Sequence, residues 1–352
     1  MAIRRLVVKV GTSSLTDESG GFRREMAKSL VSQVARVRDA GVGVVMVVSG
    51  AIALGLSQLG LERPQPTEVL QAASGVGQVQ MISALREIFH EAGMEMAQLL
   101  LAPHDFGDRQ QYLHARQTLE SLFALGVVPV INENDAIASE EIRFGDNDRL
   151  SALVAHLIYA DLLLLLTDLE GVYTADPRSS GEARFIPIFD VEEKEQVRAT
   201  GSGTDRGSGG MASKLQAAEI AARSGVDCMI ASAATPEVVA KVAAGEPVLA
   251  TFVPRKSVRE PARRLWIAYA TNPEGRLVVD EGAKRALLER NASLLAVGIR
   301  AVEGEFLAHA IVEVAGEDGK VFAKGVVRTD SKGVTGAASE VIHRDDLVTL
   351  TP

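Results

Sequence analysis

The chain has 352 residues, a length that predicts two or three domains with a full hydrophobic core. Hydrophobic residues make up 47% and charged residues 24%, which excludes a largely disordered chain. The net charge of −9 disfavours a generally basic nucleic-acid binder, and the single cysteine, Cys228, excludes an internal disulfide framework. The opening MAIRRLVVKVG does not predict a signal peptide, and the apolar runs are too short to span a membrane, so we expect a soluble cytoplasmic protein.

Short apolar runs alternate with helical patterns over the first 250 residues. The runs rich in valine, isoleucine and leucine predict strands at Leu6–Val10, Val42–Val48, Met96–Leu101, Val127–Ile131, Leu162–Thr167 and Asp227–Ala231. Helices are expected around Met26–Val37 and over Val69–Glu91, Tyr112–Leu125, Asp148–Ala160 and Met211–Ser224. Nearly all-apolar strands separated by helices favour a mostly parallel sheet sandwiched by helices, an α/β fold. Ligands of such sheets bind beyond the carboxyl ends of the strands.

The pattern changes near residue 250. The stretch Thr251–Thr271 carries five basic residues, one acidic residue and two prolines, and we interpret it as a linker or an extended strap. Beyond it, short glycine-broken strands and one helix, Ala283–Arg290, predict a small β-rich domain. We therefore expect a catalytic domain over 1–255, a basic linker over 256–271 and a β-rich domain over 272–352.

Several common motifs are absent. There is no G-x-x-x-x-G-K-[ST] sequence, which disfavours a Walker-type NTPase, and the dinucleotide fingerprint fails because Gln80 follows Gly75 and Gly77. Ser49 lacks the preceding glycine of a nucleophile elbow. The six histidines and the cysteine show no metal-ligand spacing, and no metal-ligating residues are predicted.

Polar and glycine-rich clusters stand instead at the ends of the predicted strands. Lys9 and Gly11 close the first strand, and Ser49 leads from the second strand into a helix. Asn132–Asp135 follows a later strand, and Gly145–Arg149 opens the next helix. Their density of asparagine, aspartate and glycine exceeds what a turn requires and indicates a functional site.

Two further clusters complete this set. Thr167 and Asp168 end the most apolar strand. Five glycines lie within Gly201–Gly210, directly before a helix that carries Lys214 in its first turn. A flexible linker would explain the glycines, but glycine loop, helix N-terminus and lysine together are typical of a phosphate-binding site.

Two lysines and glycine-rich backbone at one sheet edge indicate phosphoryl transfer. A carboxylate acceptor is ionised at pH 7 and needs no general base, because its ordinary pKa is about 4.3. The remaining difficulty is repulsion between the carboxylate and a triphosphate, which lysines and Mg²⁺ would offset. The residues therefore predict a kinase and allow a carboxylate as its acceptor.

Six sequence motifs agree in order and spacing with those of a known family. They are VVKVGTS, VVSGAIALG, VVPVINENDA, FGDNDRLSALVA, LLLLTDLEGVYTADPR and GSGGMASKLQAA. Over residues 1 to about 255 the chain resembles the glutamate 5-kinases, which have the amino-acid-kinase fold, and its tail resembles a PUA domain. The resemblance implies that ATP and L-glutamate give L-glutamyl 5-phosphate and ADP with Mg²⁺, the first step of proline biosynthesis. It also implies feedback inhibition by proline and a homo-oligomer, often a tetramer.

The resemblance also implies residue roles. Lys9 and Lys214 match positions at the transferring phosphoryl group, and Asp148 matches an acid that organises the catalytic lysines. The glutamate-binding positions match Ser49, Asp135 and Asn147. The ATP-binding positions match Lys9, Gly11, Thr167, Asp168, Ser208, Gly209, Gly210, Met211, Ala212, Ser213 and Lys214.

Three other functions compete with this prediction, two of them kinases of the same fold and one an RNA-related function. Acetylglutamate kinase and aspartokinase share the fold, but the first usually lacks such a tail and the second usually adds other regulatory domains. An RNA-binding or RNA-modifying protein is suggested by the PUA-like tail. RNA is an unlikely partner, because residues 272–352 have a net charge of −3 and only two aromatic residues, Phe306 and Phe322.

Overall fold

The computed structural model describes residues 3–137, 147–192, 210–269, 273–334 and 340–350. Contacts divide the chain into two compact units. The first holds Met1–Asp105 and Arg109–Arg259, and the second holds Phe106–Asp108 and Glu260–Pro352.

Among the described residues, the first unit is built on a seven-stranded sheet with the order β3-β4-β2-β1-β5-β8-β9. Its strands are β1 (Arg5–Val10), β2 (Gly43–Val48), β3 (Met96–Leu101), β4 (Val128–Glu133), β5 (Leu162–Thr167), β8 (Asp227–Ser232) and β9 (Ala250–Val253). Neighbouring strands are parallel except β8 and β9, which are antiparallel. The predicted α/β fold with a mostly parallel sheet is confirmed, and the first six strands fall where the apolar runs predict them.

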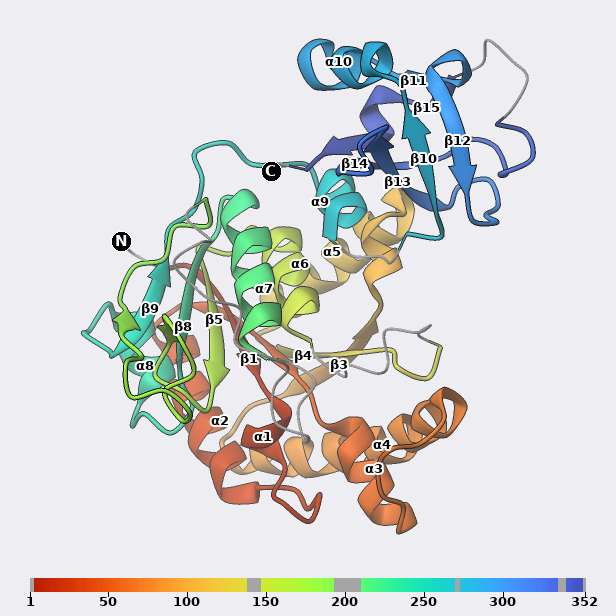
Figure 1. Ribbon diagram of the computed structural model, residues 1–352. Helices are drawn as coiled ribbons and strands as arrows, with labels where there is room; N and C mark the ends of the chain where they lie inside the picture. The colour runs from red at the N-terminus through yellow and green to blue at the C-terminus, as the bar shows by residue number, and fades with distance from the viewer. Residues whose placement is uncertain (1–2, 138–146, 193–209, 270–272, 335–339, 351–352) are drawn as a thin grey trace. The chain divides into compact units, whose positions relative to one another are not determined.

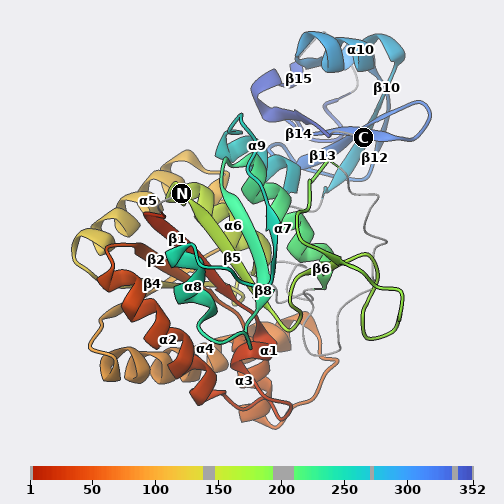
Figure 2. The same cartoon turned by 90° about the vertical axis from the view of Figure 1, so that its left-hand side faces the viewer.

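Helices cover both faces of this sheet, as Figures 1 and 2 show. They are α1 (Thr12–Leu15), α2 (Arg24–Asp39), α3 (Ala51–Leu59), α4 (Thr67–Glu91), α5 (Arg109–Ala124), α6 (Asp148–Leu157), α7 (Met211–Arg223) and α8 (Val238–Ala244), with a 3₁₀ turn η1 (Pro103–Phe106). A small hairpin joins β6 (Val172–Tyr173) to β7 (Phe185–Ile186). Within the described part of the chain, no helix combines the length and apolar character needed to cross a bilayer.

Alternation along β1 decides where its lysine points. Leu6, Val8 and Val10 enter the hydrophobic core formed with α2, α4 and α8. Successive side chains of a strand point to opposite faces, so Lys9 lies on the other face, where α6 packs against β1. A lysine inside an otherwise apolar strand is thereby directed under a helix rather than into the core.

Helices α3 and α4 cross at two glycines. A Cβ atom on Gly55 would lie 1.7 Å from the carbonyl oxygen of Ala73, and one on Gly77 would lie 1.9 Å from the carbonyl oxygen of Ala51. The two backbones are therefore in direct contact. This crossing holds the middle of α4 against the start of α3, immediately after the end of β2.

The second unit is β-rich. Its elements are α9 (Ala262–Tyr269), β10 (Gly275–Val279), α10 (Glu281–Arg290), β11 (Leu294–Leu295), η4 (Ala296–Gly298), β12 (Ile299–Glu303), β13 (Ile311–Gly316), β14 (Val321–Val326), β15 (Glu340–Ile342), η5 (Arg344–Asp346) and β16 (Leu347–Thr349). Described strands form one sheet with the order β12-β10-β13-β14-β16 and a two-stranded pair of β11 and β15. The Asp280 side chain caps α10 by accepting a hydrogen bond from the Ala283 amide at 2.8 Å.

The expected strap over residues 251–271 is wrong in two places. Residues 251–253 belong to β9, which closes one edge of the first unit's sheet. Residues 262–269 form α9, whose Ile267 and Ala268 are buried against β13, β14 and β16. Arg263 and Arg264 stand beside the apolar residues of α9, and Pro261 directly precedes the helix, where proline is commonly found.

Candidate active site

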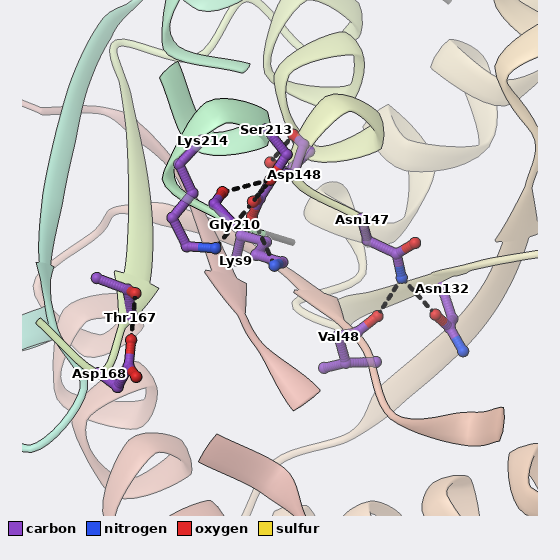
Figure 3. Close-up of polar contacts among 11 residues, drawn as sticks. Lys9, Val48, Asn132, Asn147, Asp148, Thr167, Asp168, Gly210, Ser213 and Lys214 are labelled. Atoms are coloured by element: carbon purple, nitrogen blue, oxygen red, sulfur yellow. Dashed lines mark hydrogen bonds and ion pairs between the residues drawn. The ribbon is translucent and has the colours of Figure 1, made fainter. Parts of the chain in front are cut away.

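A buried aspartate joins the two predicted catalytic lysines. Asp148 Oδ1 lies 2.5 Å from Lys9 Nζ, and Asp148 Oδ2 lies 3.0 Å from Lys214 Nζ. Exposed fractions of the side chains are 2% for Lys9, 7% for Lys214 and 0% for Asp148. One carboxylate therefore sits between two ammonium groups inside the protein and holds both at one place, as Figure 3 shows.

Three elements supply this cluster. Lys9 stands near the end of β1, which pairs with β2 and β5. Asp148 begins α6, where a negative charge is favoured by the helix dipole. Lys214 lies in the first turn of α7, and Ser213 Oγ lies 2.9 Å from Asp148 Oδ2 and 2.8 Å from the Gly210 carbonyl oxygen. The first turns of α6 and α7 are thus tied together over the end of β1.

A second group is a chain of side-chain amides. Asn147 Nδ2 donates to the Val48 carbonyl oxygen and to Asn132 Oδ1, both at 2.5 Å (Figure 3). Asn132 Nδ2 in turn donates to Gln78 Oε1 at 2.5 Å. The chain links the start of α6, the end of β2, the end of β4 and the middle of α4. It places Asn147 next to Ser49, whose 2%-exposed hydroxyl has no hydrogen-bond partner in the described residues.

Asp135 lies beside a cavity of about 390 Å³. Its side chain is 7% exposed, and its Oδ2 accepts a hydrogen bond from Ser74 Oγ at 3.0 Å. Burial raises the pKa of Asp135 to about 6, although the Ser74 hydroxyl and the positive charge of Arg63 act in the opposite direction. The cavity is also lined by Gln78. It therefore offers a carboxylate and a buried amide to a polar ligand.

The predicted nucleotide residues stand at neighbouring strand and helix ends. Thr167 Oγ1 donates to Asp168 Oδ1 at 3.0 Å at the end of β5, as Figure 3 shows. Arg178 forms an ion pair with Asp168. Burial alone would raise the pKa of Asp168, but the hydrogen bonds from Arg178 and Thr167 outweigh it and lower that pKa. Gly11 lies two residues after Lys9, and a Cβ atom on it would lie 3.8 Å from Lys9 Nζ.

The remaining predicted nucleotide residues belong to the glycine-rich loop and the helix after it. Gly210 caps α7, and Met211, Ala212, Ser213 and Lys214 form its first turn. Ser208 and Gly209 lie outside the described residues.

The structure therefore brings Lys9, Asp148 and Lys214 into one cluster. It connects Asn147 to the strand end before Ser49. The Thr167–Asp168 pair lies at the end of β5, the strand that pairs with β1 beside the lysines. Ser74 and Gln78 were not predicted from the sequence, although they interrupt the apolar face of α4 between Leu70 and Met81 at helical spacing. Polar residues on an otherwise apolar helix face were the feature of the sequence that could have indicated their role.

Magnesium has few candidate ligands in this cluster. No group of three or more acidic, histidine or cysteine side chains suited to a metal is found in the described parts of the chain. Asp148, the buried carboxylate nearest the lysines, already has an ammonium group close to each oxygen. Mg²⁺ is commonly held by substrate phosphates and water with one or two carboxylates, so the residues present fit a metal ion that enters with a nucleotide.

Comparison with known proteins gives two family matches. The model of the amino acid kinase family matches residues 4–232, and the model of the PUA domain matches residues 275–344. The first covers the strand and helix ends that carry the lysine cluster and the amide chain. The second covers most of the β-rich unit.

Relatives match the chain over nearly its whole length. It is 44% identical to a glutamate 5-kinase of Frankia casuarinae, with 99% of this chain and 97% of that protein covered. It is 41% identical to a glutamate 5-kinase of Pelobacter propionicus, with 99% and 98% covered. A solved isopentenyl phosphate kinase covers 71% of this chain and 99% of its own with a TM-score of 0.51 at 18% identity, which shows the fold alone.

Proposed function

Because the chain belongs to the amino acid kinase family and, within it, to the glutamate 5-kinases, we propose that it phosphorylates the side-chain carboxylate of L-glutamate with ATP. A glutamate oxygen attacks the γ-phosphorus, and the bond from that phosphorus to the β-phosphate oxygen breaks. The products are L-glutamyl 5-phosphate and ADP. The observation that carries the proposal is the buried Lys9–Asp148–Lys214 cluster within a chain 41–44% identical to glutamate 5-kinases.

The two lysines have a specific task in this reaction. Carboxylate and triphosphate are both anions, so their approach is opposed by repulsion and favoured by fixed positive charge. Lys9 and Lys214 supply that charge, and Asp148 is a positioning residue that keeps both ammonium groups in place before substrate arrives. Mg²⁺ carried by the ATP phosphates neutralises further charge on them. Thr167, Asp168 and the first turn of α7 are proposed to hold the nucleotide.

The glutamate site is proposed around Ser49, Asp135 and Asn147. Asp135 carries the charge that offsets the α-ammonium group, which predicts that free glutamate reacts and N-acetylglutamate does not. The direct test measures ADP release with glutamate, N-acetylglutamate and aspartate in parallel, with hydroxylamine present to trap the acyl phosphate as a hydroxamate. Hydroxamate formation from glutamate alone is expected. Preferential turnover of either other substrate would replace this proposal with acetylglutamate kinase or aspartokinase.

The pH dependence of glutamate use is expected to follow Asp135. As pH falls through about 6, Asp135 takes up a proton and loses the charge that pairs with the α-ammonium group, so kcat/KM for glutamate falls. Below that pH the loss is expected to approach tenfold per pH unit. The measurement is kcat/KM for glutamate between pH 5 and pH 8.5 at saturating Mg²⁺–ATP.

Asp135→Asn is the matched control for this profile, because it keeps the shape of the side chain and removes the titration. The variant should have a high KM for glutamate and little further loss below pH 6. ATP also titrates in this range, but it does so equally with both proteins. An identical inflection in wild type and variant would assign the pH effect to another group.

We also propose the finer properties that the family suggests. They are a place at the start of proline biosynthesis, a cytoplasmic location, feedback inhibition by proline and a homo-oligomer, often a tetramer. Proline carries a cationic nitrogen and a carboxylate on one carbon, so it fits the same charged groups as the α-amino-acid end of glutamate. Association between copies is supported by exposed apolar side chains at the edge strand β3 and the adjoining α4, Leu100 at 40% and Val79 at 70% exposure.

A further inference from the structure

Gln78 is the least explained polar side chain near the proposed glutamate site. It lies in the middle of α4, is only 9% exposed and lines the cavity beside Asp135. Its Nε2 atom is buried and has no hydrogen-bond partner in the described part of the chain. A buried amide donor without a partner is costly, on the order of 1–3 kcal/mol, so its presence calls for a ligand.

The orientation of the Gln78 amide is set by backbone groups. The Glu133 backbone N–H donates to Asn132 Oδ1 at 3.0 Å, which identifies that atom as the acceptor end of the Asn132 amide. Asn132 Nδ2 is therefore the donor, and the Gln78 atom that it meets must be the carbonyl Oε1. The other end of the Gln78 amide is then the NH₂ group. A flipped amide would place two NH₂ groups against each other.

The Gln78 amide donor lies close to Asp135, because both are next to the same face of α4. Ser74, which donates to Asp135, stands four residues before Gln78, and side chains at that spacing are neighbours on one helix face. The cavity therefore offers an acidic acceptor at one turn of α4 and an amide donor at the next. An α-amino-acid end carries one cation and one anion on a single carbon. Asp135 suits the ammonium group, and an NH₂ donor suits only the carboxylate.

We infer that Gln78 is a specificity-determining residue whose Nε2 donates a hydrogen bond to the α-carboxylate of glutamate. This inference rests on the proposed function and deepens it. Asn132 acts through Gln78 as a positioning residue, because its own amide is fixed by the Glu133 backbone and fixes that of Gln78 in turn. The arrangement selects substrates that carry an ammonium group and a carboxylate together at the end remote from the reacting carboxylate.

Gln78→Glu tests the inference because it changes only the donor end of the side chain. One carboxylate oxygen can still accept from Asn132, while the other replaces the NH₂ group with an acceptor. Hydrogen bonds to charged groups contribute about 1.5–3 kcal/mol, so KM for glutamate should rise about 10- to 100-fold while KM for ATP stays within about twofold. Glutamate binding without ATP, measured by titration calorimetry, should weaken by the same factor.

Gln80→Glu is the matched control, since Gln80 is exposed on the same helix and is not among the residues that line the cavity. It introduces the same charge and should raise KM for glutamate less than threefold. Gln78→Met removes the donor without adding a charge and should raise KM about tenfold, which covers the case in which Gln78→Glu fails to fold.

A substrate analogue separates recognition from a structural role. 4-Aminobutyrate has the reacting carboxylate and the ammonium group of glutamate but no α-carboxylate. Its KM should be unchanged within about twofold by Gln78→Met, while that of glutamate rises. If both rise together, or if glutamate KM is unaffected in both Gln78 variants, the inference is overturned. Wild-type protein that makes no hydroxamate from glutamate would instead refute the proposed function.

Discussion

Replacing Lys9 with methionine is expected to lower kcat for glutamyl phosphate formation by at least about 10²–10³, and Lys214→Met is expected to do the same. Each change removes a fixed positive charge from the place where phosphoryl transfer develops negative charge, and removing a single such partner typically lowers the rate by this factor. Methionine keeps most of the length of the buried side chain, so the expected loss lies in catalysis rather than in packing. ADP release under saturating substrates is the measurement.

Lys256→Met controls for the loss of a lysine elsewhere in the same unit. Lys256 Nζ pairs at 2.9 Å with Asp190, whose side chain is 43% exposed. Its variant should keep kcat within about twofold, and the melting temperatures of all three variants should be compared with wild type. Near-native kcat in either Lys9→Met or Lys214→Met would remove that lysine from the mechanism.

Asp148→Asn is expected to lower the free energy of unfolding by about 3–5 kcal/mol as well as to inactivate the enzyme. Breaking a buried ion pair by removing one partner has this effect because the remaining charge stays buried without compensation. Here two ammonium groups, on Lys9 and Lys214, would face each other across a neutral amide. Urea unfolding, followed by far-UV circular dichroism and by a probe of the first unit, measures the change.

The matched comparison is Asp190→Asn, which removes a carboxylate from an ion pair near the surface. Exposed pairs contribute about 0–1 kcal/mol, so this variant should be nearly as stable as wild type. Equal losses in the two variants would mean that the Asp148 cluster stabilises the fold no more than a surface pair does.

The sequence predicted most of the strands and most of the polar residues at their ends, because both depend on local pattern. Apolar runs marked six strands of the sheet, and the polar residues after them marked Lys9, Asn147 and Asp148. The sequence could not predict which of these residues contact one another in the folded protein. Lys9 and Asp148 are 139 positions apart, and their contact follows from the parallel pairing of β1 with its neighbours and from α6 packing on β1.

The errors have physical causes. In α9 two adjacent arginines, Arg263 and Arg264, precede the residues of a short buried face, among them Leu265 and Ile267. Gln78 was missed because a glutamine on an amphipathic helix is ordinarily solvated. Only the fold shows that its face of α4 is buried and that its amide continues the Asn147–Asn132 chain.

The glycine crossing of α3 and α4 has a consequence for how this protein can vary. Any side chain at position 55 or 77 would overlap a carbonyl oxygen of the other helix, so substitution there requires the helices to separate. Gln78 directly follows Gly77, and Ala51 lies two residues beyond Ser49, so separation would move both walls of the proposed glutamate site at once. In a library of random variants, these two positions should be among the least tolerant in the chain. Changes of specificity that preserve the enzyme must therefore come from exchanging side chains around a fixed helix pair.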